Sequence, residues 1–154
     1  MQNSDLEYVG FWPRVGAAII DSLLTLVITM PLVLWIYGWA YFDSEKFIQG
    51  PADFVISCLF PMIAVILFWL KKQATPGKMA VSATIVDAAT GQPMSVAQAT
   101  GRYLAYFISL IPLGLGIWWV AFDARKQGWH DKLAGTVVVR PKNRAPKAVQ
   151  FKQS

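Results

Sequence analysis

Residues 14–41 read RVGAAIIDSLLTLVITMPLVLWIYGWAY, and this stretch decides the class of protein. The apolar run 15–41 is long enough to cross the hydrocarbon core of a bilayer, which takes about 20 helical residues at ~1.5 Å of rise each. Asp21 lies within this run, and Arg14 stands two helical turns earlier, at its start. An aspartate at the centre of a membrane helix costs about 2.5 to 3.5 kcal/mol, so Asp21 is expected to have a function and a partner.

The overall composition is that of a membrane protein. Of the 154 residues, 55% are hydrophobic and only 15% are charged, and the mean hydropathy is +0.42. The chain has room for one domain with few membrane helices, so a pathway would need several copies, and we expect a homo-oligomer in the lipid bilayer. Cys58 is the single cysteine and lies in an apolar run, which excludes a disulfide framework and favours packing as a small hydrophobe.

The distribution of charge predicts the topology. The second apolar run, residues 54–70, follows a linker that carries three acidic residues and one lysine, and Lys71 and Lys72 come directly after it. By the positive-inside rule the linker is outside, while the N-terminus and the segment after residue 70 are cytoplasmic. Residues 1–12 lack a basic region, so we expect no cleavable signal peptide.

Two short β-type segments follow the second apolar run. Residues 81–86 alternate apolar and small polar side chains, and residues 136–140 are rich in valine. A lone strand is unstable, so the two segments are expected to pair on the same, cytoplasmic side of the membrane. The C-terminus is then cytoplasmic as well, and the segment between the strands must return to its starting side.

The segment between these strands has the pattern of a broken helical hairpin. Residues 95–111 have a helical pattern, PLGLG at 112–116 interrupts it, and 117–123 form only a short apolar run. The alternative is one straight span over residues 103–122, which would leave the basic C-terminus outside, against the positive-inside rule. We therefore predict an all-α membrane protein with two spanning helices, a broken helical hairpin and a small cytoplasmic β element.

One face of the first helix is polar. At 100° per residue, Arg14, Asp21 and Thr25 lie in a narrow stripe. Arg14 and Asp21 are about 10 Å apart along the axis, so each is expected to need a partner from another segment. We favour an internal polar network; the alternatives are that Arg14 is an interfacial anchor and that Asp21 is a protonated or hydrogen-bonded packing residue.

A conspicuous polar motif lies near the C-terminus, where residues 128–136 read GWHDKLAGT and valines follow. With an arginine that opens the first membrane helix and an aspartate seven residues later, this motif resembles the RDD family of small bacterial membrane proteins, named for one arginine and two aspartates. The similarity extends over residues 8–140 and includes the TPGK turn at 75–78 and Arg102.

The resemblance implies roles for particular residues. Arg14 would be the family's arginine and Asp21 its first aspartate. The second would be Asp123 or Asp131, with Asp131 favoured because it stands inside the matching His-Asp motif. His130 beside it has the chemistry of a proton relay; the alternative is that Asp131 caps a short turn and His130 fills an interface.

Other chemistries find no support in the sequence. The segment before Lys78 is not a phosphate-binding loop, because Lys72 occupies the earlier glycine position and Met79 replaces the serine or threonine. The sequence contains no metal-ligand cluster, nucleophile elbow or dinucleotide loop, so we expect neither an enzyme nor a cofactor or metal. Residues 141–154 form a basic tail that we expect to be disordered and attracted to anionic lipid rather than to nucleic acid, which leaves residues 1–140 as the membrane domain.

The resemblance also implies a bacterial inner (cytoplasmic) membrane and a transport role, including sodium/proton exchange for some members. Our leading hypothesis is a multi-pass transporter or ion/proton exchanger for sodium or protons, with Asp21 as the titrating group and Arg14 as its electrostatic counterpart. The alternative is a non-catalytic membrane scaffold or assembly partner. The candidate polar network comprises Arg14, Asp21, Thr25, Arg102, Asp123, His130 and Asp131.

Overall fold

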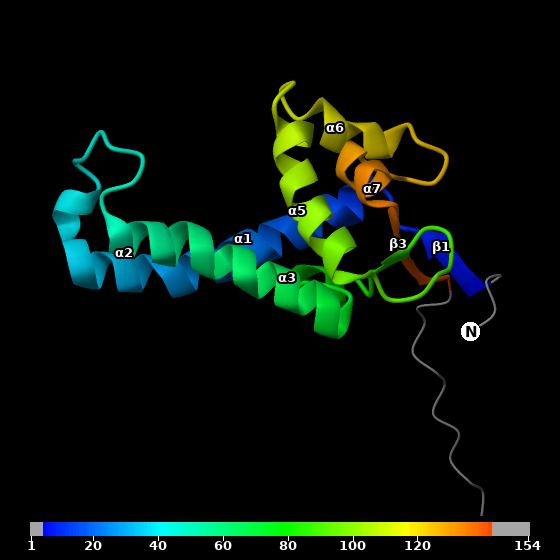
Figure 1. Cartoon of the computed structure of the whole chain (residues 1–154), viewed down its shortest axis with the longest axis horizontal. Helices are drawn as coiled ribbons and strands as arrows, with labels where there is room; N and C mark the ends of the chain where they lie inside the picture. Colours follow the sequence, from blue (N-terminus) through cyan, green and yellow to red (C-terminus); the bar gives the residue numbers. More distant parts are fainter. Residues whose placement is uncertain (1–4, 143–154) are drawn as a thin grey trace, which may run out of the picture.

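A long helical hairpin dominates the computed structural model, which describes residues 5–142 (Figure 1). Its first arm is α1 (Phe11–Tyr37), which leads through η2 (Trp39–Tyr41) into a loop. The second arm is continuous: α2 (Pro51–Phe54), a π-helical turn η3 (Val55–Leu59) and α3 (Phe60–Lys72). Within residues 5–142, Phe11–Tyr37 and Pro51–Lys72 are the two helices long and apolar enough to cross a membrane. Both predicted spans are thus confirmed as membrane-type helices.

The ends of the hairpin arms follow from local chemistry. Pro31 lies inside α1 without interrupting it, and the helix stops at Gly38, whose φ of 65° favours glycine. The Gly38 amide donates to the Leu34 carbonyl at 2.8 Å, which satisfies one of the last helical carbonyls. At the other end of the second arm, Gln73 adopts a left-handed conformation and closes α3 by donating to the Trp69 carbonyl.

A broken helix pair packs at one end of this hairpin. α5 (Val96–Leu110) starts with a capping box, in which the Ser95 hydroxyl and the Gln98 side chain each accept from the other's backbone amide. α6 (Leu115–Trp118) and η4 (Trp119–Ala121) follow after a break and are bent by 111° from α5. The predicted break is present, and a straight helix over residues 103–122 is not formed.

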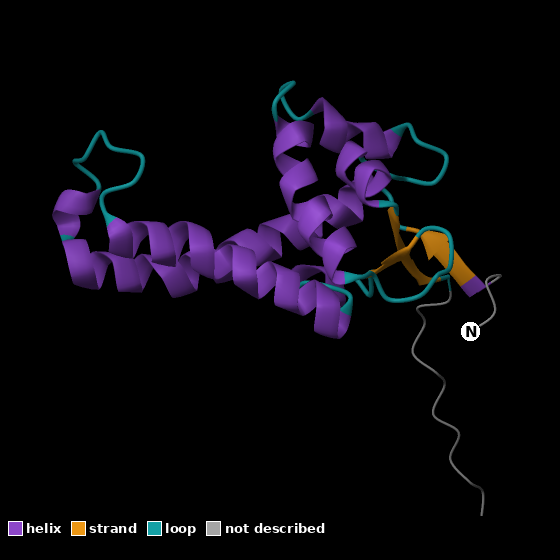
Figure 2. Ribbon diagram, viewed as in Figure 1, coloured by secondary structure: helices purple, strands orange, loops and turns teal. Residues whose placement is uncertain are grey.

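A three-stranded antiparallel sheet covers the end of the hairpin from which α1 starts (Figure 2). β3 (Thr136–Pro141) lies in the centre, with β2 (Thr84–Asp87) on one side and β1 (Leu6–Tyr8) on the other. The predicted pairing of the two β-type segments is correct, with Ile85 opposite Val138. β1 was not predicted, because three residues are too few to show an alternating pattern.

Two short helices complete the described chain. α4 (Pro76–Ala80) follows α3, and α7 (Trp129–Ala134) precedes β3. Of the predicted basic tail, Pro141 ends β3 and Lys142 donates its amide to the Asp5 carbonyl, so the tail starts later than expected. Residues 143–154 lie outside the described part of the chain.

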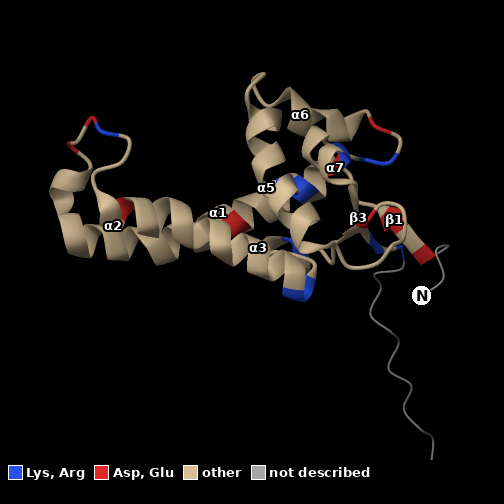
Figure 3. Ribbon diagram, in the orientation of Figure 1, with Lys and Arg blue, Asp and Glu red and all other residues tan. Residues whose placement is uncertain are grey.

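The buried core lies where the hairpin, the sheet and α5 meet, and it comprises Val9, Trp69, Ala83, Ile85, Met94, Ala99 and Val138. Elsewhere large apolar side chains are exposed along α1, α3 and α5, as expected for helices in contact with lipid. Figure 3 shows the shaft of the hairpin almost free of charge, apart from one acidic segment on α1 and one on α2, where the sequence has Asp21 and Asp53. The protein is therefore a mostly helical membrane protein with a small sheet.

Candidate functional site

A buried ion cluster is centred on Asp131, at the start of α7. Its carboxylate accepts hydrogen bonds from the Arg14 guanidinium at 2.5 Å and, through the other oxygen, from Arg102. The Gly128 amide donates to the same carboxylate at 3.0 Å. The side chains of Asp131 and Arg102 are fully buried, and that of Arg14 is 12% exposed. The two guanidinium groups, Arg102 first and Arg14 second, hold the pKa of Asp131 far below its usual range, although burial alone would raise it.

Each arginine has further partners that fix its position. Arg14 donates to the Val9 carbonyl at 3.1 Å and to the Lys126 carbonyl at 2.5 Å. Arg102 donates to the Thr136 hydroxyl at 2.5 Å, and its guanidinium lies 5.3 Å from the ring centroid of Trp69. The cluster thus connects α1, α5, α7 and β3 in one network.

His130 is a buried neighbour of this cluster. Its ring stacks on Tyr106 with 3.9 Å between centroids, and its amide donates to the Ser109 hydroxyl at 3.1 Å. Burial lowers the pKa of His130 to about 3; the Asp131 carboxylate opposes this shift, and Arg102, Arg14 and Lys78 reinforce it. His130 is therefore neutral at pH 7, which fits an interface residue better than a proton relay.

Asp21 belongs to a separate centre. One of its carboxylate oxygens accepts from the Thr75 hydroxyl at 2.5 Å, and the other accepts from the Gly77 amide at 2.7 Å. These donors lie at the start of α4, so Asp21 caps that helix from the side of α1. A Cβ atom at Gly77 would lie 2.0 Å from the Ala17 carbonyl oxygen, so only glycine allows this approach.

Arg14 and Asp21 do not pair with each other, and each binds another segment, as helical geometry predicted. Arg14 binds Asp131 because the chain brings α7 to the start of α1, while Asp21, two turns further along α1, binds the start of α4. Thr25 joins neither centre, since its hydroxyl donates to the backbone carbonyl of Asp21 at 2.9 Å, within its own helix.

Asp123 also lies apart from the cluster. It forms an ion pair of 2.6 Å with Lys132 and accepts from the Arg125 and Gln127 amides, so it closes the turn before α7. The hydrogen bond from Lys132, together with these amides, keeps the pKa of Asp123 below its usual value, while burial opposes the shift. Of the two candidates for the family's second aspartate, Asp131 is the one that contacts Arg14.

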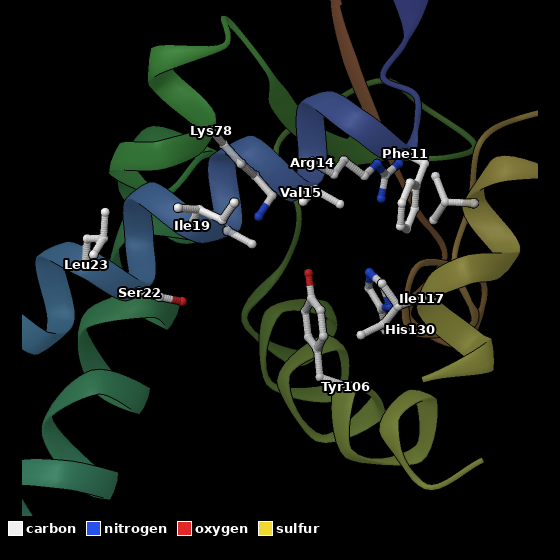
Figure 4. A pocket seen from close by; sticks show the side chains of 12 residues that line it. Phe11, Arg14, Val15, Ile19, Ser22, Leu23, Lys78, Tyr106, Ile117 and His130 are labelled. Carbon is white, nitrogen blue, oxygen red and sulfur yellow. The ribbon is translucent and has the colours of Figure 1, made fainter. Parts of the chain in front are cut away.

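Two cavities adjoin these centres. The first, of about 380 Å³, is bordered by Phe11, Arg14, Val15, Ala18, Ile19, Ser22, Leu23, Lys78, Tyr106, Ile117, Val120 and His130. The second, of about 330 Å³, is bordered by Ala18, Asp21, Ser22, Val65, Trp69, Thr75, Lys78, Tyr103, Tyr106, Phe107 and Leu110. Figure 4 shows the first cavity, with the ends of Arg14, Lys78, Tyr106 and His130 directed at one space. Lys78 and Tyr106 border both cavities.

Sequence reasoning noted the TPGK turn but did not assign its residues to a site. Thr75, Gly77 and Lys78 all face α1: the first two bind Asp21, and the third borders both cavities. The signal that could have predicted this contact is a turn with proline and glycine directly after a membrane helix. Such a turn exposes backbone amides that can donate to a carboxylate such as that of Asp21.

A second buried carboxylate, at the far end of the hairpin, was also missed. Asp53 is 1% exposed and accepts from the Gln49 amide at 2.9 Å, the Ser57 hydroxyl at 2.8 Å and the Tyr41 hydroxyl at 3.1 Å. Its position before an apolar run had placed it in an external linker. Within residues 5–142, no three or more His, Cys, Asp and Glu side chains lie close enough to hold a metal ion.

The sequence profile of the RDD family matches residues 8–135, which include both aspartate centres and the whole sequence from α1 to α7. The chain belongs to the RDD family. The resemblance inferred from Arg14, Asp21 and the GWHDKLAGT motif is thus confirmed.

Two relatives of this chain are described as uncharacterized. The chain is 29% identical over 147 residues to the uncharacterized protein YxaI of Bacillus subtilis (strain 168), covering 84% of this chain and 95% of YxaI. It is 40% identical over 75 residues to the uncharacterized protein RP437 of Rickettsia prowazekii (strain Madrid E), covering 49% of this chain and 41% of RP437. The chain thus spans less than half the length of RP437. No solved structure matches it.

Proposed function

We propose that this RDD protein is a membrane transporter that exchanges a small cation, sodium being the first candidate, for protons at Asp21. The observation that carries the proposal is the contrast between Asp131, which is buried, and Asp21, which is partly buried. Asp131 is held by two guanidinium groups, whereas Asp21 forms no ion pair with a described residue and borders a cavity of about 330 Å³. A carboxylate free of a fixed cation can bind either a proton or a metal cation.

The surroundings of Asp21 suit such an exchange. The Gly77 amide and the Thr75 hydroxyl both donate to the carboxylate and so fix its position at the cavity. A hard cation prefers oxygen ligands, which the Asp21 carboxylate and the Thr75 hydroxyl supply from two different segments. Asp131 is unsuitable as the exchanging acid, because its protonation would leave two buried arginines without their shared counterion.

The setting of the exchanger is a bacterial inner membrane. In the orientation favoured by the positive-inside rule, the sheet end of the hairpin is cytoplasmic and the loop between α1 and α2 is external. The pair α5 and α6 then enters from the cytoplasmic side and returns, as irregular backbone does where it lines a cavity. Because few helices cannot enclose a continuous pathway, we expect a homo-oligomer; an active, monodisperse monomer in nanodiscs would refute that assembly.

The exchange is tested by reconstitution of the full chain in liposomes that contain a pH-sensitive dye. An imposed sodium gradient should move protons in the opposite direction, and an imposed pH gradient should move sodium. Protein-free liposomes and liposomes with heat-denatured protein report the leak. Flux no faster than the leak under both gradients would overturn the proposal.

A second candidate function is that of a membrane scaffold without transport activity. The observation in its favour is that Asp131 ties α1, α5 and α7 together through Arg14 and Arg102, a network with an evident structural use. A scaffold would form a defined assembly in the absence of ion flux. The liposome assay, together with the oligomeric state of the same preparation, therefore distinguishes the two functions.

A further inference from the structure

The first cavity has a polar inner end. Arg14, Lys78, Tyr106 and His130 border it there, and Figure 4 shows the Lys78 amine and the Tyr106 hydroxyl directed into the same space. The His130 ring nitrogen Nε2 is buried and has no hydrogen-bond partner within residues 5–142. The cavity therefore presents donors to a ligand, rather than acceptors alone.

Lys78 is the charged side chain at this end that lacks a bonding partner within residues 5–142. Its amine forms no hydrogen bond or ion pair within residues 5–142, although α4, which carries it, is anchored to α1 through Gly77 and Asp21. An ammonium group in a partly dry cavity is costly without a counterion. The rigid attachment of α4 keeps the amine at the cavity, so the missing counterion is expected to come from outside the chain.

The charge balance of the surroundings points the same way. Arg14 and Arg102 share the single carboxylate of Asp131, so this cluster has one positive charge in excess. Lys78 adds a further positive charge at the cavity wall, and Asp21, which borders the adjoining cavity with Lys78, offsets only one charge, so the balance stays positive. A ligand with a negative head group is complementary to this end.

The outer end of the cavity is apolar and opens toward the lipid-facing side of α1. Ile19 and Leu23 border it and are 55% and 57% exposed, so part of each side chain faces the space that acyl chains occupy in a membrane. Ile117 and Val120 of the broken pair border the cavity from the other side. Its volume of about 380 Å³ lies in the range of small-molecule sites, roughly 300 to 1,000 Å³.

We propose that this cavity binds an anionic amphiphile from the membrane, with its phosphate or carboxylate head at Lys78 and its acyl chain between α1 and α6. The positive inner end and the lipid-facing apolar end match the two halves of such a molecule. This site shares Lys78 and Tyr106 with the cavity at Asp21, but the proposal does not depend on whether the protein transports ions.

Binding is tested on the detergent-purified full chain by native mass spectrometry with oleoyl lysophosphatidate as the probe. Oleoyl lysophosphatidylcholine is the probe without net charge, and inorganic phosphate is the head group without a chain. Lys78→Gln should weaken lysophosphatidate binding at least about tenfold, because a charge-assisted hydrogen bond is lost. Lys78→Arg should restore most of it, and Lys71→Gln, at an exposed lysine outside the cavity, should change it less than about twofold.

Location is tested with a photoreactive diazirine fatty acid and peptide mapping. Cross-links should fall on the peptides around Ile19 and Ile117 and should disappear with Lys78→Gln. The proposal is overturned if Lys78→Gln and Lys71→Gln bind lysophosphatidate equally, if the cross-links lie elsewhere, or if inorganic phosphate displaces the lipid. The last result would assign Lys78 to a soluble anion.

Discussion

Arg14 and Asp131 lie 117 positions apart in the sequence and form an ion pair of 2.5 Å. The pair joins the first membrane helix to the short helix before the last strand, and Arg102 of α5 contacts the other oxygen of the same carboxylate. Asp131 thus holds three segments together with a charge that two arginines require. Its role follows from the fold, whereas Asp21 forms no ion pair within residues 5–142, and this difference is the basis of the proposed exchange at Asp21.

Asp131→Asn should destabilise the protein severely. The substitution leaves two buried arginines without their counterion, a loss of about 3 to 5 kcal/mol for a broken buried pair. We expect a large fall in the thermal unfolding temperature in detergent and a smaller yield of monodisperse protein. Asp123→Asn is the matched control: its ion pair with Lys132 is partly exposed and should contribute about 1 kcal/mol or less. Equal stability of the two variants would contradict the central position of Asp131.

Gly77→Ala should push α4 away from α1. The new methyl group would lie 2.0 Å from the Ala17 carbonyl oxygen and 2.9 Å from the Asp21 carboxyl carbon, and backbone cannot yield as a flexible side chain does. We expect a cost of about 3 kcal/mol, at the upper end for an overpacked site. Gly101→Ala, where no atom lies within 4 Å of the added methyl group, should be neutral or slightly stabilising. A Gly77→Ala protein as stable as Gly101→Ala would show that α4 does not pack as described.

Stability should fall on mild acidification because of His130. Its pKa is lowered to about 3 in the folded protein, first by burial, and stays near 6.5 in the unfolded chain. The unfolded state therefore takes up a proton as the pH falls below 6.5, while the folded state does not, and the loss approaches about 1.4 kcal/mol per pH unit. Thermal unfolding between pH 7.5 and 4.5 measures this slope, which should flatten in His130→Gln. Aspartates do not explain it, since their unfolded-state pKa values lie near 3.8.

Both flanks of the sheet should face one side of the membrane and the α1–α2 loop the other. In a Cys58→Ser background, Thr90→Cys and Lys142→Cys should react with a membrane-impermeant maleimide only after the inner face is opened. Lys46→Cys should react in intact cells. Labelling of Thr90→Cys and Lys142→Cys from opposite sides would be incompatible with the pairing of β2 and β3.

The elements that the sequence predicted are those with long or periodic signals. The length of the two apolar runs predicted the two membrane helices. Two glycines and a proline predicted the break at 112–116. The partner strands β2 and β3 followed from the instability of a lone strand. β1 has three residues, and its pairing depends on β3, so no local signal reveals it.

The site was predicted only in part, because its contacts are long-range. Helical geometry showed that Arg14 and Asp21 each needed a partner elsewhere, but it could not say which segment would supply it. The partners proved to be α7 and the turn at Thr75, which lie far from α1 in the sequence. Asp53 was not predicted as a buried residue, because its carboxylate accepts hydrogen bonds from three neutral donors. Such donors leave no charge pattern in the sequence.

The central claim, that Asp21 is the cation-exchanging carboxylate, is tested most directly by proton flux in liposomes carrying Asp21→Asn. Asparagine keeps the size and one accepting oxygen, so the variant should fold and still cap α4, yet it can neither bind a proton nor neutralise a cation. Asp123→Asn removes the same charge outside both cavities and serves as the control. We predict that sodium-driven proton flux falls to the leak of protein-free liposomes in Asp21→Asn and persists in Asp123→Asn. Full flux through a folded Asp21→Asn protein would contradict the account.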